Sequence, residues 1–191
     1  MLKSSAVPLN IDNVDTDQII PARFLKATER KGFGDNLFRD WRYNSDDSPV
    51  ESFPLNNKKY EGKILVAGKN FGCGSSREHA VWAIYDYGFR AVVSSFFADI
   101  FKNNCLNIGV LPIQVSESFL AEIFSEIDIN PRNNFEINLQ NQEFEIINSH
   151  KKEKFKISTY KKSNMSNGFD DIDYLINKKD KISAFANKTK Y

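Results

Sequence analysis

The most regular hydrophobic pattern lies between residues 63 and 130, where short apolar runs alternate with segments of helical periodicity. The runs "KILVA" (63–67), "RAVVSS" (90–95) and "IGVLPI" (108–113) have the length and the Val and Ile content of buried strands. Helical spacing of apolar residues follows each run, in "SREHAVWAIYDYG", "FADIFKNNCLN" and "SESFLAEIFSEI", and Gly88 suits the end of the first helix. This alternation predicts an α/β fold with a parallel sheet and right-handed crossovers.

The zones on either side have different patterns. Residues 1 to about 60 lack sustained periodicity and contain the turn-rich segments "DNVDTDQ" and "YNSDDSP", which predict short strands and long functional loops. In the third zone, about 131–191, "NFEINL" and "QEFEII" alternate like an antiparallel hairpin, and "DDIDYLINKK" predicts a helical tail. The lysines between 151 and 162 indicate a solvated face. We therefore expect a single domain, 1–191, built from these three zones.

Composition narrows the classes of protein. A chain of 191 residues with 41% hydrophobic residues can bury one substantial core. Lys plus Arg total 26 and Asp plus Glu 25, so no large field of one sign favours nucleic acid or an anionic membrane. We find no signal-peptide pattern and no apolar run near the roughly 18 residues of a membrane span, so we expect a cytoplasmic protein. Two cysteines fit a reducing compartment.

The segment "GKNFGCGSSREHA" (68–80) concentrates glycines and polar residues where the first predicted strand turns into a helix. Ligands of open α/β sheets bind at that edge. A P-loop, a dinucleotide fingerprint and a nucleophile elbow all fail, because Cys73, Arg77 or Glu78 stands where each needs another residue. The segment instead predicts an anion-binding helix start, with amides exposed at Gly72 and Gly74.

Two interpretations of the serines remain open at this point. Ser75-Ser76-Arg77-Glu78 matches the S-x-x-E capping box, so Ser75 could simply cap the helix. Alternatively, Arg77 pairs with a ligand carboxylate and a serine hydroxyl acts as a base. A helix dipole contributes at most about 2 kcal/mol, or roughly one and a half pKa units. A serine base therefore needs a water-excluded site and further donors, each worth about 3 to 4 kcal/mol.

Longer motifs carry a resemblance to a known family. The segment "NFGCGSSREHAVWAIYDYGFRAVV", followed by "SFFADIF" and "LNIGVLPI", resembles the swivelling domain of the aconitase superfamily, and most closely the family of bacterial small subunits of 3-isopropylmalate dehydratase. Further signatures stand in the same order: "NVDTDQIIPARFL" (13–25), "GFGDNLFRDWRY" (32–43) and "MSNGFDDID" (165–173). The resemblance implies a three-layer swivelling β/β/α domain around the mainly parallel βαβ core.

The same resemblance implies a hydro-lyase of leucine biosynthesis that isomerises 2-isopropylmalate and 3-isopropylmalate through isopropylmaleate. By position, Ser75 is the catalytic base that removes the carbon-bound proton. The resemblance also implies a loop at residues 24–36 that recognises the isopropyl group, and a pocket shaped partly by Asp15. The substrate-binding positions that it implies are Ser76, Arg77, Arg23, Gly74, Thr16 and Asp17.

The family uses a [4Fe-4S] cluster with one open iron, which needs three cysteine thiolates. Because this chain has only Cys73 and Cys105, we expect no cofactor or metal site in it. We expect the cluster on a larger partner, the dehydratase large subunit, and an inactive small subunit in its absence. The other expected ligand is a small dicarboxylate substrate.

Other functions remain open. The substrate could be citramalate or homocitrate, or the chain could be a noncatalytic carboxylate-binding module. A self-sufficient hydrolase would instead use Cys73 and His79 as nucleophile and base. We favour packing or pocket lining for Cys73, and a structural hydrogen-bonding role for His79.

Overall fold

The computed structural model describes residues 1–26 and 31–188. The chain divides into two compact units, Met1–Lys156 and Ile157–Tyr191. The first unit contains a parallel sheet of four strands in the order β2-β3-β4-β5. The strands are β2 (Ala6–Leu9), β3 (Ile64–Ala67), β4 (Ala91–Ser94) and β5 (Leu111–Gln114). The predicted α/β class and the three core strands are confirmed, and β2 adds a fourth from the irregular zone.

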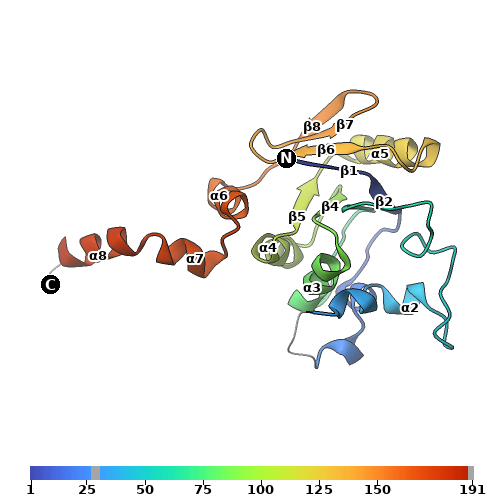
Figure 1. Cartoon of the computed structure of the whole chain (residues 1–191), viewed down its shortest axis with the longest axis horizontal. Coiled ribbons are helices and arrows are strands. Elements are labelled where there is room, and N and C mark those ends of the chain that lie inside the picture. Colours follow the sequence, from blue (N-terminus) through green and yellow to red (C-terminus); the bar gives the residue numbers. More distant parts are fainter. Residues whose placement is uncertain (27–30, 189–191) are drawn as a thin grey trace. The chain divides into compact units, whose positions relative to one another are not determined.

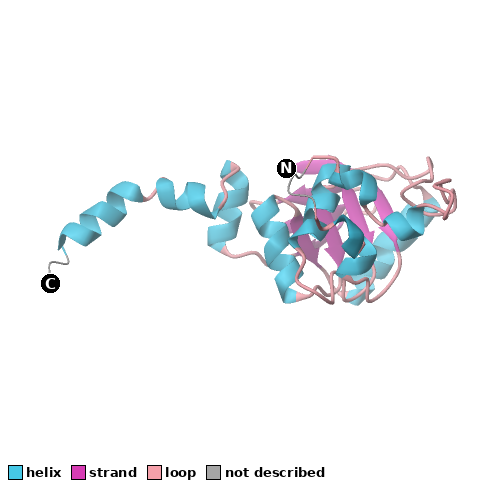
Figure 2. Cartoon of the chain, turned by 90° about the horizontal axis from the view of Figure 1, so that it is seen from below, coloured by secondary structure: helices cyan, strands magenta, loops and turns pink. Residues whose placement is uncertain are grey.

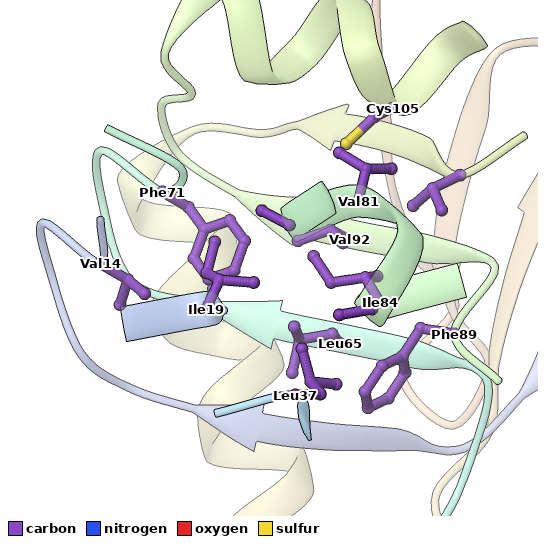
Figure 3. Close-up of a cluster of buried hydrophobic side chains, with 14 of the residues drawn as sticks. Val14, Ile19, Leu37, Leu65, Phe71, Val81, Ile84, Phe89, Val92 and Cys105 are labelled. Atoms are coloured by element: carbon purple, nitrogen blue, oxygen red, sulfur yellow. The ribbon is translucent and has the colours of Figure 1, made fainter. Parts of the chain in front are cut away.

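Helices cover this sheet where the periodicity placed them: α3 (Glu78–Tyr87), α4 (Asp99–Ile108) and α5 (Glu117–Ile129). Val81 and Ile84 of α3 lie in one apolar cluster with Leu65 and Val92 of the sheet (Figure 3). Val66, the next residue of β3 after Leu65, is buried but lies outside that cluster, because successive strand residues point to opposite faces of the sheet. The buried residues of α5 also lie outside it, so α5 covers the face opposite α3.

An antiparallel sheet forms the third layer, beyond the parallel sheet (Figure 1). Its order is β1-β6-β7-β8, with β1 (Leu2–Ser4), β6 (Phe135–Asn138), β7 (Glu143–Ile146) and β8 (Lys151–Lys154). The ring centroids of Phe119 on α5 and Phe144 on β7 lie 6.2 Å apart, which ties this sheet to α5. The predicted hairpin of β6 and β7 is confirmed, and the three layers match the expected β/β/α architecture.

Strand β8 was not expected, because "KKEK" carries no apolar alternation. It pairs with β7, and Lys152 lies opposite Glu145 with its Nζ 2.9 Å from that carboxylate. Backbone pairing and cross-strand charges suffice for such an edge strand, and charged side chains are typical of edges. The lysines of β8 are exposed, as expected, whereas the Lys161 side chain, which belongs to the same predicted solvated face, is only 16% exposed.

The rest of the first zone consists of loops and short helical turns, in agreement with its irregular pattern. These are α1 (Thr16–Ile19), two 3-10 turns, η1 (Ala22–Phe24) and η2 (Phe33–Asn36), and α2 (Arg39–Arg42). Gly34 of η2 fits tightly against α3, because a Cβ there would lie 2.5 Å from the Tyr87 nitrogen. The Gly34 amide donates to the Asp86 carboxylate at 2.8 Å.

The second unit is helical, with α6 (Thr159–Asn167), α7 (Asp171–Ile176) and α8 (Lys179–Lys188) (Figure 2). The predicted helical tail is thus confirmed. The boundary after Lys156 falls inside the expected third zone, and the single domain 1–191 stays a prediction. Within the described residues, no helix has both the length and the apolar character that crossing a bilayer requires.

Candidate functional site

Two loops meet at the carboxyl edge of the parallel sheet, one after β2 and one after β3. The Thr16 amide donates to the Cys73 carbonyl at 3.0 Å, and the Gly72 amide donates to the Val14 carbonyl at 2.8 Å. The side chain of Asp15 caps α1 by accepting from the Gln18 amide at 2.8 Å. The two predicted motifs, "NVDTDQ" and "NFGCGSSREHA", are therefore hydrogen-bonded into one structure.

Gly72 and Gly74 allow the loop after β3 to take this course. Both have positive φ, 76° and 85°, a region that other residues rarely adopt. A Cβ on Gly72 would lie 2.1 Å from the Phe101 ring of α4, so no larger residue fits there. The Gly72 and Cys73 amides donate to Val14, which contradicts the expectation that the Gly72 amide is exposed for a ligand.

The free amides lie further along the loop. Within the described part of the chain, the amides of Gly74, Ser75 and Ser76 have no protein acceptor. All three residues are exposed. Three successive free amides ahead of a helix are suitable donors for a carboxylate.

The capping-box interpretation of Ser75 is wrong. Helix α3 begins at Glu78 with Arg77 as its N-cap, and no side chain caps it. The Ser75 carbonyl accepts from the Arg77 amide and from the Thr16 hydroxyl, both at 2.8 Å, and this holds Ser75 outside the helix. The Glu78 carboxylate instead accepts from the Trp82 indole at 3.1 Å. The Ser75 side chain is therefore not used for capping.

These residues line a pocket of about 280 Å³. One wall is polar and contains the candidates Thr16, Gly74, Ser75, Ser76 and Arg77. The opposite wall is mainly apolar and comes from α4 and the residue before it: Ala98, Asp99, Ile100 and Phe101. Sequence reasoning missed this second wall, although α4 follows the carboxyl end of β4, where ligands of parallel sheets bind.

Arg77 and Asp17 form an ion pair across the junction between α3 and α1. The Arg77 side chain is 19% exposed, whereas that of Asp17 is 53% exposed. The predicted residue Asp17 therefore reaches the pocket through Arg77, whose guanidinium it holds in place.

The structure does not bring Arg23 to this pocket. Its guanidinium pairs with the Asp40 carboxylate and lies 4.7 Å from the centre of the Phe24 ring. The hydrogen bond from Arg23 lowers the pKa of Asp40 below its ordinary value. Arg23 lines a separate polar hollow with Arg39 and Asp40, and its substrate-binding role stays a prediction.

Part of the predicted specificity loop, 24–36, can be followed. Residues 27–30 lie outside the described residues. Phe33 is buried, and its ring centroid lies 5.6 Å from that of His79 and 5.8 Å from that of Trp82. The end of this segment is therefore fixed to α3.

The residues proposed for a cysteine hydrolase do not form a nucleophile and base. The Cys73 thiol lies 3.4 Å from the Asn13 carbonyl oxygen, to which it donates, and burial and the Asp15 charge raise its pKa. The His79 ring packs against Phe33 and Trp82. The expected hydrogen bond of His79 is not found among the described contacts. A raised pKa is the opposite of what an activated thiolate needs.

The residues of this chain do not fit an iron–sulfur cluster. Cys105 is completely buried in the core beside α3, and burial raises its pKa well above the ordinary value (Figure 3). Cys73 lies in the site loop, and the sequence contains no third cysteine. No group of three His, Cys, Asp or Glu residues converges as metal ligands in the described ranges, 1–26 and 31–188.

Comparisons with known proteins agree with this architecture. A family model described as the aconitase C-terminal domain matches residues 1–118. The chain is similar to a solved structure of 3-isopropylmalate dehydratase from Methanocaldococcus jannaschii, with a TM-score of 0.70 and 32% identity. This match covers 95% of the chain and 97% of the other.

Similarity to curated proteins extends along the full length. A 3-isopropylmalate dehydratase small subunit from Cytophaga hutchinsonii is 58% identical, over 100% of this chain and 94% of that protein. The small subunit from Azobacteroides pseudotrichonymphae is also 58% identical, over 100% of this chain and 97% of that protein. The chain therefore belongs to the aconitase C-terminal domain family and, within it, to the family of 3-isopropylmalate dehydratase small subunits.

Proposed function

We propose that the chain supplies the proton-transfer half of an active site that isomerises 2-isopropylmalate and 3-isopropylmalate through isopropylmaleate. The observation that carries this proposal is the pocket in which Ser75 and Ser76 present free amides and hydroxyls beside Arg77. Its full-length relatives are named as small subunits of this dehydratase. A large subunit completes the site, and the family resemblance assigns the Lewis-acid chemistry at the substrate hydroxyl to a [4Fe-4S] cluster there.

The first task of this chain is to hold the dicarboxylate. Arg77 is already oriented by Asp17, and its remaining N–H groups pair with a substrate carboxylate. The free amides of Gly74, Ser75 and Ser76 receive the negative charge at the start of α3. The Ser76 hydroxyl adds a further donor. Thr16 acts indirectly, because its hydroxyl fixes the Ser75 carbonyl.

The second task is to move the proton. The Ser75 oxygen removes the proton from the carbon next to the one that carries the hydroxyl, and the electron pair of that C–H bond becomes the second bond of isopropylmaleate as the hydroxyl leaves. In the rehydration step the same oxygen returns the proton to the carbon that lost the hydroxyl, and the hydroxyl is added to the carbon that lost the proton. Ser75 is exposed in this chain, so the dry surroundings that a serine base needs must come from a partner that closes the pocket.

The decisive experiment mixes this chain anaerobically with a cluster-loaded large subunit and follows 3-isopropylmalate dehydration by the absorbance of the unsaturated product. Ser75→Ala should lower kcat by about 10²- to 10⁴-fold, the usual contribution of general base catalysis. Ser125→Ala is the matched control, because Ser125 is an exposed serine on α5. It should leave turnover unchanged.

Each other outcome has a distinct meaning. Full activity of Ser75→Ala would show that Ser75 is not the catalytic base. Wild-type binding to the large subunit without turnover would favour citramalate or homocitrate as substrate. If none of the three substrates turns over, the noncatalytic carboxylate-binding module becomes the better description.

A further inference from the structure

The carboxyl edge of the parallel sheet continues past the pocket towards β5. Because the strand order is β3-β4-β5, the residues after β4 and β5 follow the Ser75 loop in one row. Phe96, after β4, is 47% exposed, and Ile100, on the first turn of α4, is 55% exposed. Large apolar side chains grouped beside a functional pocket indicate a binding surface.

A second hollow follows these two residues along the edge. It measures about 320 Å³ and is lined by Lys102, Gln114, Val115, Ser116, Lys154 and Lys156. Helix α4 joins the two hollows, because Asp99, Ile100 and Phe101 line the first and Lys102 lines the second. The two hollows are therefore lined by consecutive residues of α4.

The second hollow carries excess positive charge. Lys154 and Lys156 are exposed and have no ion pair among the described residues. The Lys102 ammonium donates to the Gln114 amide oxygen at 3.3 Å. The nearby Glu153 carboxylate accepts from the amide and the hydroxyl of Ser116, both at 2.6 Å. It brings one negative charge against three lysines, so the hollow keeps a positive excess.

We propose that one surface of this chain docks the cluster-carrying large subunit, which meets it with an apolar patch flanked by carboxylates. This surface, the α4 surface, consists of Phe96, Ile100, Lys102, Lys154 and Lys156. This inference rests on the proposed function, which requires a partner to cover Ser75. A partner that closes the pocket must pass over Ile100, because Ile100 is part of the pocket wall. Beyond Ile100, the lysines favour a partner surface with carboxylates at its rim. This charge pairing sets the orientation and the association rate of the two subunits.

The test measures the dissociation constant of the two subunits by titration calorimetry, with the wild-type chain and two variants. Phe96→Ser removes an apolar anchor that does not line the Ser75 pocket, and Lys154→Glu/Lys156→Glu reverses the charge. Each should weaken binding by about tenfold or more, as expected for interface hot spots. The charge variant should also lose most of the salt dependence of the association rate.

Matched controls separate docking from general surface effects. Ile129→Ser changes an apolar residue that is 77% exposed on α5, at the opposite face of the parallel sheet. Lys3→Glu/Lys58→Glu makes the same charge change at two exposed lysines elsewhere. Both controls should bind as the wild type does.

Circular dichroism must show that every variant is folded. Normal binding by both α4-surface variants would overturn the inference, whether or not the wild-type pair is active. If the variants lose binding and the wild-type pair shows no turnover, the docking surface is supported and the proposed reaction is rejected. If Phe96→Ser instead abolishes self-association of this chain, the surface joins two copies and the assignment to the large subunit is wrong.

Discussion

Several side chains of the site are positioned by hydrogen bonds and ion pairs that sequence motifs do not display. Thr16 holds the Ser75 carbonyl, and Asp17 holds the Arg77 guanidinium. We propose that these two residues act mainly by fixing Ser75 and Arg77, the groups assigned to the substrate.

The Arg77–Asp17 ion pair leads to a kinetic prediction. Asp17→Asn should raise KM by about tenfold and change kcat by less than about twofold, because a guanidinium that is no longer held loses more conformational freedom on binding. Steady-state kinetics of the assembled enzyme measure both constants. A lower KM would instead show that Asp17 competes with the substrate carboxylate for Arg77.

The two cysteines should differ in reactivity. Burial raises the pKa of both thiols, so each holds less thiolate at a given pH than a free cysteine does. With a chromogenic disulfide reagent, native Cys73 should react slowly and faster as pH rises, whereas Cys105 should react only after unfolding. A rapid reaction of Cys73 at pH 6 would restore the thiolate nucleophile as a possibility.

At the level of elements, the loop after β3 is held against α4 by close packing. Gly72→Ala should lower the free energy of unfolding by about 2 to 5 kcal/mol, since it combines a strained φ with overlap on the Phe101 ring. Gly88→Ala is the control, because its φ is also positive but its Cβ would meet no atom within 4 Å. The control should lose only about 1 to 2 kcal/mol, and urea unfolding measures both.

Hydrophobic periodicity predicted the core strands, the helices and the hairpin, because each element buries a regular stripe of side chains. It could not predict β8, which is held by backbone pairing and charges. The capping box failed for a similar reason. The local motif left capping by Ser75 open, but a tertiary hydrogen bond from the distant Thr16 hydroxyl to the Ser75 carbonyl holds this residue outside the helix.

At the scale of the whole molecule, the sequence predicted which residues of one loop form the polar wall, since the motif is contiguous. The opposite wall comes from α4, about 25 residues later, and only the sheet order brings it there. Arg23 shows the converse limit. The resemblance predicts substrate binding for Arg23. Its side chain pairs with Asp40 in another hollow, so that role stays a prediction.

The contact between Gly72 and Phe101 also constrains how this family can vary. Only the absence of a Cβ at position 72 leaves room for the ring at position 101. A sequence with any larger residue at 72 must carry a smaller one at 101, and the backbone must still reach a positive φ. Substitutions at the two positions should therefore be inherited together, which makes them a covarying pair across subunits of this kind.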